Sequence, residues 1–100
     1  MPTINDALRA AGKLLLEKPT TGYFARTVEG ESCGVLDAEA DCFCFEGALL
    51  RMSLKLNLPF HRLRDKARLV SGCKTANTWD YAGADRQMEI ANKLASVTDP

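Results

Sequence analysis

The chain has 100 residues, of which 46% are hydrophobic and 26% charged, and its formal net charge at pH 7 is zero. This length and composition predict one globular domain and exclude a disordered chain. No apolar run approaches the roughly 18–20 residues needed to cross a bilayer, and the first residues lack the pattern of a signal peptide. We therefore expect a single domain over residues 1–100, cytoplasmic, without membrane contact.

The first predicted element is a helix that begins after Thr3 and ends before Pro19. Thr3 and Asp6 have the spacing of a capping box, in which a hydroxyl and a carboxylate satisfy the first free backbone amides. Proline ends the pattern because it cannot continue a helix. The apolar residues repeat at three- and four-residue spacing and form one stripe: Ile4, Ala7, Leu8, Ala11, Leu14 and Leu15.

A short β-hairpin is predicted next, between the first two helices. Residues 23–28 and 32–35 are rich in β-formers, and residues 28–31 have the composition of a turn around Gly30. An isolated hairpin is marginally stable, so we expect this one to cover helix ends with Tyr23 or Phe24 as its anchor.

The second helix is predicted from Asp37 or Ala38 to about Leu56. Apolar residues occupy more than half of its circumference, which indicates the central and most buried helix. Gly47 is an unfavourable residue in a helix interior. We therefore expect another backbone to approach closely at that position.

Two further helices complete the predicted fold. Pro59 suits the first helical position of a third helix, whose apolar stripe ends before Gly72. A last helix is predicted from about Gly83 to Ser96, capped by Asp80, with residues 97–100 frayed. The expected fold is therefore mainly α, with minor β content: four helices around one core and a short β-hairpin between helices 1 and 2.

Charge is sorted along the chain instead of mixed. Residues 27–50 contain six acids and no Lys or Arg, whereas residues 51–74 contain seven Lys or Arg and one acid, giving a net charge of +6. The cations of the third helix fall off its apolar stripe and are expected to point to water. Segregated charge creates a field that selects partners. The candidate partner-binding residues, for protein or nucleic acid, are Arg51, Lys55, Arg62, Arg64, Lys66, Arg68 and Lys74.

Two aromatic residues before the last helix are further candidates. Trp79 and Tyr81 have the side chains that often anchor protein interfaces. The alternative is that Trp79 packs at the start of the last helix as a hydrophobic staple.

No pattern in the chain predicts catalysis, a metal or a cofactor. Cys42 and Cys44 lie two residues apart on the predicted second helix, so their thiols should diverge instead of sharing one ion. A thiol nucleophile needs a base, and His61 is the only histidine. We expect ordinary packing of reduced cysteines and no enzyme activity, with a structural zinc site as the weaker alternative.

Several segments of the chain form a recognisable series. They are the Ala7-Leu8-Arg9-Ala10-Ala11 and Gly22-Tyr23-Phe24-Ala25-Arg26 runs, Gly30, Ala40, the Cys44-Phe45-Glu46-Gly47-Ala48-Leu49 run and Asn77-Thr78-Trp79-Asp80. In this order they resemble a family of small uncharacterised bacterial and phage proteins. The resemblance implies a compact α-rich domain with a short hairpin, and it brings no established reaction, cofactor or substrate.

The sequence thus predicts a small non-catalytic protein-interaction domain with opposed acidic and basic faces. Its partner is either a second copy or another charged protein. The phage resemblance adds the expectation of a phage- or mobile-element-type accessory or inhibitor protein, by analogy alone. The alternative function is nucleic-acid binding through the basic helix around residues 60–70.

Overall fold

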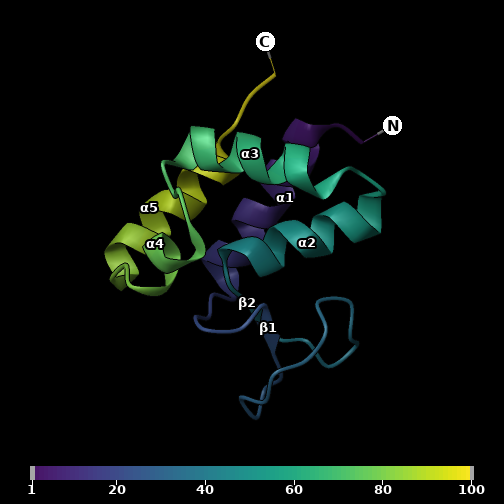
Figure 1. The fold of residues 1–100 in the computed structure, drawn as a ribbon, viewed down its shortest axis with the longest axis vertical. Coiled ribbons are helices and arrows are strands. Elements are labelled where there is room, and N and C mark those ends of the chain that lie inside the picture. The colour runs from purple at the N-terminus through teal and green to yellow at the C-terminus, as the bar shows by residue number, and fades with distance from the viewer. Residues whose placement is uncertain (1, 100) are drawn as a thin grey trace.

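The computed structural model describes residues 2–99, which form five helices and one two-stranded sheet (Figure 1). The four longer helices share one core, and the sheet lies between the first two helices in the sequence, so the predicted mainly α class is confirmed. The elements in chain order are α1 (Ile4–Glu17), β1 (Ala25–Arg26), β2 (Cys42–Phe43), α2 (Phe45–Leu56), α3 (Phe60–Ser71), α4 (Ala76–Asp80) and α5 (Ala84–Ala95).

The start of α1 is fixed by the predicted capping box. The Thr3 hydroxyl accepts a hydrogen bond from the Asp6 amide (3.1 Å), and the Asp6 carboxylate accepts one from the Thr3 amide (2.9 Å). These bonds satisfy two amides that an α-helix leaves unpaired at its start. The amide of Thr3, followed by the guanidinium of Arg9, lowers the pKa of Asp6.

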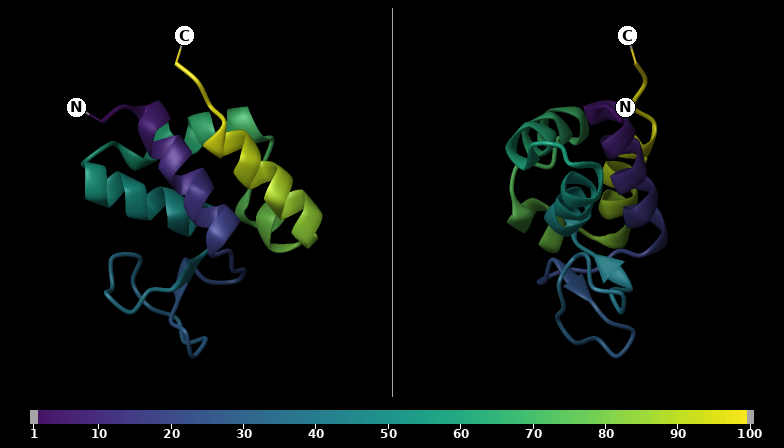
Figure 2. Two further views of the ribbon diagram at one scale, coloured as in Figure 1. Left: turned by 180° about the vertical axis from the view of Figure 1, so that it is seen from behind. Right: turned by 90° about the vertical axis from the view of Figure 1, so that its right-hand side faces the viewer.

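The most extensive helix packing joins α1 to α5, the first and last helices (Figure 2). Gly12 allows this close approach, because a Cβ at that position would collide with the backbone of Ala95. The sequence predicts the second helix as the central and most buried one. In the structure, α1 packs more extensively than α2, mostly against α5 and next against α2. The extensive contact between α1 and α5 depends on the absence of a Cβ at Gly12, which lets the two backbones come together.

The residues after α5, which the sequence predicts to be frayed, contact α1 through Val97 and Asp99. Arg9 Nη1 donates to the carbonyl of Val97 (2.8 Å), and Asn5 Nδ2 donates to Asp99 Oδ1 (3.0 Å). Side-chain hydrogen bonds thus replace helical ones at this end of the chain. Pro100, also part of that prediction, lies outside the described residues.

The sheet forms, but its second strand is not the predicted one. Ala25 pairs with Phe43 and Arg26 with Cys42 in antiparallel register, whereas the predicted 32–35 strand contributes a single bridge from Ser32 to Arg26. The turn at residues 28–31 is present. Burial of the Phe43 ring explains the choice, because this pairing places a large apolar side chain in the core.

The second helix begins at Phe45 instead of Asp37 or Ala38, because residues 37–41 form turns and residues 42–43 form β2. Cys44 is the N-cap, and its Sγ accepts a hydrogen bond from the Gly47 amide (3.3 Å). The predicted close approach at Gly47 is confirmed. A Cβ there would lie far inside van der Waals contact with the backbone carbonyl of Phe24.

A short helix, α4, is absent from the sequence prediction and connects α3 to α5. It holds Trp79, which is fully buried, and the indole Nε1 donates to the carbonyl of Thr20 (2.8 Å). Asp80 does not cap the last helix. Instead, its Oδ1 accepts a hydrogen bond from the amide of Gly22 (3.1 Å), and Gly83 is the N-cap of α5. Pro59, predicted as the first helical residue, is the N-cap of α3.

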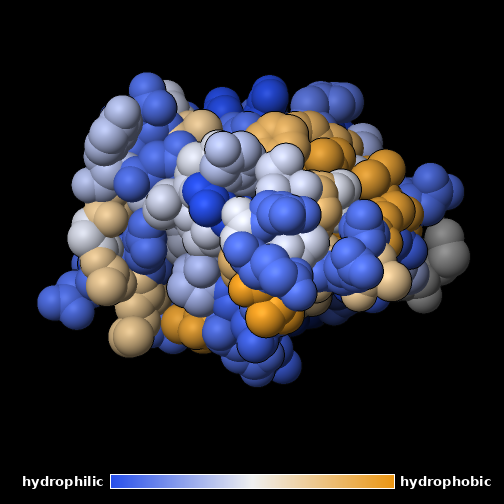
Figure 3. All heavy atoms as spheres, turned by 90° about the horizontal axis from the view of Figure 1, so that it is seen from below, coloured by the Kyte–Doolittle hydropathy of each residue, from blue (hydrophilic) through white to orange (hydrophobic). Residues whose placement is uncertain are grey.

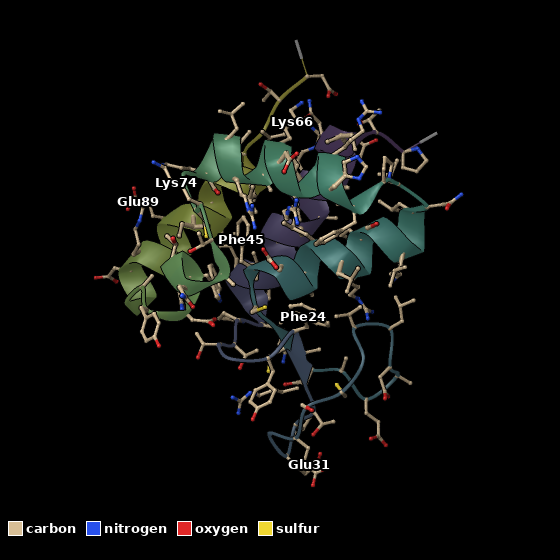
Figure 4. The ribbon with its side chains drawn as sticks, viewed as in Figure 1. Phe24, Glu31, Phe45, Lys66, Lys74 and Glu89 are labelled. Atoms are coloured by element: carbon tan, nitrogen blue, oxygen red, sulfur yellow. The ribbon has the colours of Figure 1, made fainter. Side chains whose placement is uncertain are left out.

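The loops and strands between α1 and α2 gather at one end of the long axis, below the helices in Figure 1. The helix α3 lies toward the opposite end. In Figure 4, Glu31 marks the loop end and Lys66 marks the α3 end. Glu31 of the acidic block and Lys66 of the basic block therefore lie toward opposite ends of a molecule with principal extents of 40 × 29 × 20 Å.

Candidate protein-interaction surfaces

The first candidate surface is the acidic end, which we define as residues 27–41. It carries five carboxylates, and in the part of the chain that the structure describes only Asp41 has a cation within 4.0 Å, namely Lys18 at 3.5 Å. The other four carboxylates keep their charge without a neutralising partner among these residues. They are Glu29, Glu31, Asp37 and Glu39, all of them exposed.

Apolar side chains interrupt the carboxylates of the acidic end. Val28 is 78% exposed and Leu36 is 51% exposed. Figure 3 views the molecule from this end and shows small hydrophobic areas between hydrophilic ones. A shallow hollow of about 290 Å³ also lies here, lined in part by Glu29, Glu39 and Asp41. The acidic end can therefore offer both negative charge and apolar contact area.

The second candidate surface is the basic segment, which we define as residues 51–74. Four of its seven candidate cations are exposed: Lys55, Arg62, Lys66 and Lys74. One of these already has a partner, because Lys66 Nζ donates to Asn5 Oδ1 (2.5 Å). The exposed stripe of α3 also contains Asp65 and Leu69, so it is less basic than the sequence suggests.

The remaining three candidate cations are half-buried and contact the protein itself. Arg51 donates to the carbonyl of Val35 (2.6 Å). Arg68 donates to the carboxylate of Glu46 (2.7 Å), which is the sixth acid of residues 27–50.

Arg64 lies over the Phe60 ring, 5.7 Å from its centroid. The expectation that Arg64 and Arg68 point to water is therefore wrong. Both follow directly after a buried residue of α3, and long arginine side chains fold back across apolar surface from such positions.

No ion pair joins the carboxylates of the acidic end to the cations of the basic segment among residues 2–99. The only pair between the two sequence blocks is Arg68 with Glu46, which lies outside the acidic end. The acidic end is thus not neutralised by the basic segment, although Arg51 reaches it through the backbone carbonyl of Val35.

The two aromatic candidates have opposite environments. Trp79 is fully buried, with its ring centroid 6.2 Å from that of Phe45, so it belongs to the core and cannot anchor a partner. Trp79 is a residue of α4 and packs against Phe45 of α2, whereas the alternative prediction placed it at the start of the last helix. Tyr81 is 86% exposed and remains accessible to a partner.

The cysteines are free thiols in different local structures. Cys42 lies on β2 and Cys44 caps α2, so the prediction that both lie on one helix is wrong. Burial raises the pKa of Cys44 and raises that of Cys73 to about 11, which favours the thiol over the thiolate at both positions. Across residues 2–99, no three His, Cys, Asp or Glu side chains are grouped as metal ligands.

Comparison of the chain with protein-family models, curated proteins and solved structures finds no match. Within residues 2–99 no helix combines the length and the apolar character that a transmembrane span requires. The function must therefore be argued from the surfaces of this molecule.

Sequence reasoning missed Asp80 as a surface residue that faces Tyr23 and Phe24. These two aromatics were expected to anchor the hairpin, yet about half of each is exposed. The hydrogen bond from Gly22 to Asp80 joins residues that are 58 positions apart. No local pattern predicts such a contact, and only the glycine at position 47 hinted that a backbone would pack there.

Proposed function

We propose that this chain is a non-catalytic protein-interaction domain that docks its acidic end onto a positively charged protein. The proposal is supported by one observation above all: four exposed carboxylates at one end of the molecule have no cation within 4.0 Å among the described residues. Unneutralised charge on one end favours association with a surface of opposite sign and raises the encounter rate. Exposed Val28 and Leu36 supply apolar area that charge alone does not provide.

The acidic end is better suited to docking than the basic segment. Three of the seven cations are half-buried against the protein itself, and Lys66 is bound to Asn5. A partner that used those side chains would have to break existing contacts. The carboxylates of the acidic end have no such competing ion pairs, apart from Asp41.

Nucleic-acid binding stays the alternative because exposed cations remain on and near α3. Lys55, Arg62 and Lys74 are exposed and have no carboxylate within 4.0 Å among the described residues. Phosphate contacts would make binding strongly dependent on salt. A filter-binding assay with DNA and RNA at low ionic strength tests this alternative, and retention that is lost when these three residues become Gln would favour it.

We place the interaction in the cytoplasm, where the four thiols stay reduced. The accessory or inhibitor role of a phage or mobile element is compatible with docking on a basic host protein. It rests on the family resemblance alone.

The docking proposal is tested with a variant in which the four carboxylates are neutralised as Glu29→Gln, Glu31→Gln, Asp37→Asn and Glu39→Gln. The Asn at position 37 keeps the side-chain oxygen that accepts from the Glu39 amide (3.0 Å). Proteins captured from native-host extract by the wild type are identified, purified and titrated against both forms. We expect the neutralised variant to bind the purified partner at least about tenfold more weakly at low ionic strength, with a smaller difference at high salt.

A matched control neutralises the exposed cations through Lys55→Gln, Arg62→Gln and Lys74→Gln. We expect this control to bind like the wild type. If the control loses binding and the neutralised acidic end does not, the docking proposal is wrong. Sedimentation of the wild type at low ionic strength tests the second-copy alternative, because head-to-tail contact of acidic and basic ends would produce open assemblies.

A further inference from the structure

An open surface cavity of about 330 Å³ lies between the loop that precedes β1 and the short helix α4. Its walls come from two segments that are far apart in the sequence. The lining residues are Gly22, Tyr23, Phe24, Cys44, Ala76 and Asp80. The residues are mainly apolar or aromatic, and Asp80 supplies the one carboxyl group among them.

Both walls of this cavity are held in place. The carbonyl of Phe24 accepts from the Cys44 amide (3.3 Å), and its backbone packs directly against Gly47 of α2. Trp79, next to Asp80, is buried and bound to the carbonyl of Thr20. Figure 4 shows Phe24 below α2, at the junction of the helices and the loop end. The cavity is thus supported by the core and not by mobile side chains alone.

The carboxylate of Asp80 has no counter-ion. Its Oδ1 accepts from the amide of Gly22 (3.1 Å), and no Lys or Arg of residues 2–99 lies within 4.0 Å of it. The neighbouring cation Arg26 lies beside the lining residues Gly22 and Tyr23 but forms no ion pair with Asp80. Its guanidinium lies over the Tyr23 ring, 4.2 Å from the centroid, and donates to the carbonyl of Thr21 (3.1 Å).

Lysine and arginine have the chemistry that complements this cavity. Each combines an aliphatic stem, which packs on apolar and aromatic surface, with a cation that pairs with a carboxylate. Aromatic rings also attract cations through their faces. The stacking of Arg26 on Tyr23 shows that such a contact already forms within this protein.

We infer that this cavity binds a lysine or arginine side chain of the docked protein, with the stem against Phe24 and the cationic group on Asp80. The inference rests on the proposed function, because it assigns one side-chain contact to the positively charged partner. The two residues of β1 join the lining residues 22–24 to the acidic end, and Figure 4 shows Phe24 and Glu31 on the same side of α2. The acidic end then steers the partner, and the cavity selects a basic side chain.

The inference is tested without the partner, by following backbone amide resonances of the labelled protein during titration with short peptides. The probes are acetyl-Gly-Lys-Gly-amide and acetyl-Gly-Arg-Gly-amide, with the norleucine and glutamate peptides as matched controls. We expect saturable shifts at Gly22, Phe24, Ala76 and Asp80 with a dissociation constant of about a millimolar for at least one cationic peptide. Binding of norleucine as tight as that of both cationic peptides would overturn the inference.

Two variants assign the contact to the named side chains. Asp80→Asn keeps an oxygen for the Gly22 amide and removes the charge, and it should weaken the cationic peptides about tenfold. Phe24→Leu keeps apolar volume and removes the ring, and it should weaken them about threefold. The controls are Asp85→Asn and Tyr81→Leu, which remove a charge and a ring outside the cavity.

Equal affinity of the wild type and Asp80→Asn, with an unchanged amide spectrum elsewhere, would reject the cavity as a site for basic side chains. The peptide assay also separates the two proposals. Peptide binding with no effect of the acidic-end variant on partner affinity would retain the cavity and reject the docking surface. The reverse result would retain the docking surface and reject the cavity.

Discussion

The acidic end and the basic segment differ in backbone structure and in the reach of their charged side chains. The acidic end is built mainly from turns and carries four exposed carboxylates. A fifth carboxylate, Asp41, is half-buried and has a cation partner among the described residues. The basic segment is largely helical, and three of its seven cations fold back onto the protein. A flexible arginine on a helix can cover apolar surface and find an internal acceptor. The net charge counted from the sequence of a segment is therefore larger than the charge accessible to a partner when arginines lie next to the buried stripe of a helix.

The largest effect is expected from a substitution that separates the acidic end and the strand β1 from the helices. Gly47→Ala places a Cβ against the backbone carbonyl of Phe24, which cannot move without displacing β1. We expect the free energy of unfolding to fall by about 3 kcal/mol or more, measured by chemical denaturation. Gly34→Ala is the matched control, because no atom lies within 4 Å of the added Cβ. Similar losses in both variants would contradict the close-packing explanation.

The internal use of arginine is tested by comparing Arg68→Ala with Arg62→Ala. Arg68 pairs with Glu46, whose side chain is 16% exposed, so its removal leaves a poorly solvated carboxylate without a cation. We expect a loss of about 1–2 kcal/mol in the free energy of unfolding. Arg62 is exposed, and its removal should cost less than about 0.5 kcal/mol. Equal effects would mean that the Arg68–Glu46 pair does not distinguish the two positions.

The buried thiol of Cys73, in the loop between α3 and α4, makes the stability of the protein depend on pH. Burial raises its pKa from the ordinary value of 9.0 to about 11 in the folded protein. The folded state then binds more protons than the unfolded state between these values, so stability is lost as the pH rises through this window.

We expect the free energy of unfolding to fall by about 1 kcal/mol between pH of about 7.5 and about 9.5. The variant Cys73→Ala should show a shallower decline over the same range. A decline of unchanged slope would assign the pH dependence to other groups.

The smallest expected effect concerns the acidic end itself. Glu29→Gln with Glu39→Gln removes two exposed charges that have no cation within 4.0 Å among the described residues. We expect stability to change by less than about 0.5 kcal/mol, with a slight gain at low ionic strength because like charges no longer repel. Denaturation at two salt concentrations measures this. A loss of stability would show that these two carboxylates stabilise the fold, which would contradict their assignment as side chains that are free to contact a partner.

The fold could be predicted where local chemistry decides it. The Thr3–Asp6 capping box, the stop at Gly72 and the backbone contact at Gly47 each follow from residue types at fixed positions. The strand at Cys42–Phe43 could not be predicted, because a two-residue strand is selected by its distant partner. Its apolar residues continue smoothly into the helix that follows.

The candidate surfaces were predicted only in part. The sequence located the acidic end and the basic segment, but not the return of Arg64 and Arg68 to the protein surface. It also proposed Trp79 as an anchor, whereas the core encloses it through α4. The length of the arginine side chains and packing between distant segments determine where these three residues lie. Neither property can be predicted from the local spacing of residues.

The pairing of α1 with α5 has a consequence for how the molecule is made. Because Gly12 packs against Ala95, the part of α1 that contacts α5 stays uncovered until that helix has left the ribosome. Such a long sequence separation slows folding and leaves the nascent chain dependent on late synthesis. We expect any truncation that removes α5 to leave a chain that aggregates or is degraded, even though the acidic end and the basic segment would still be present.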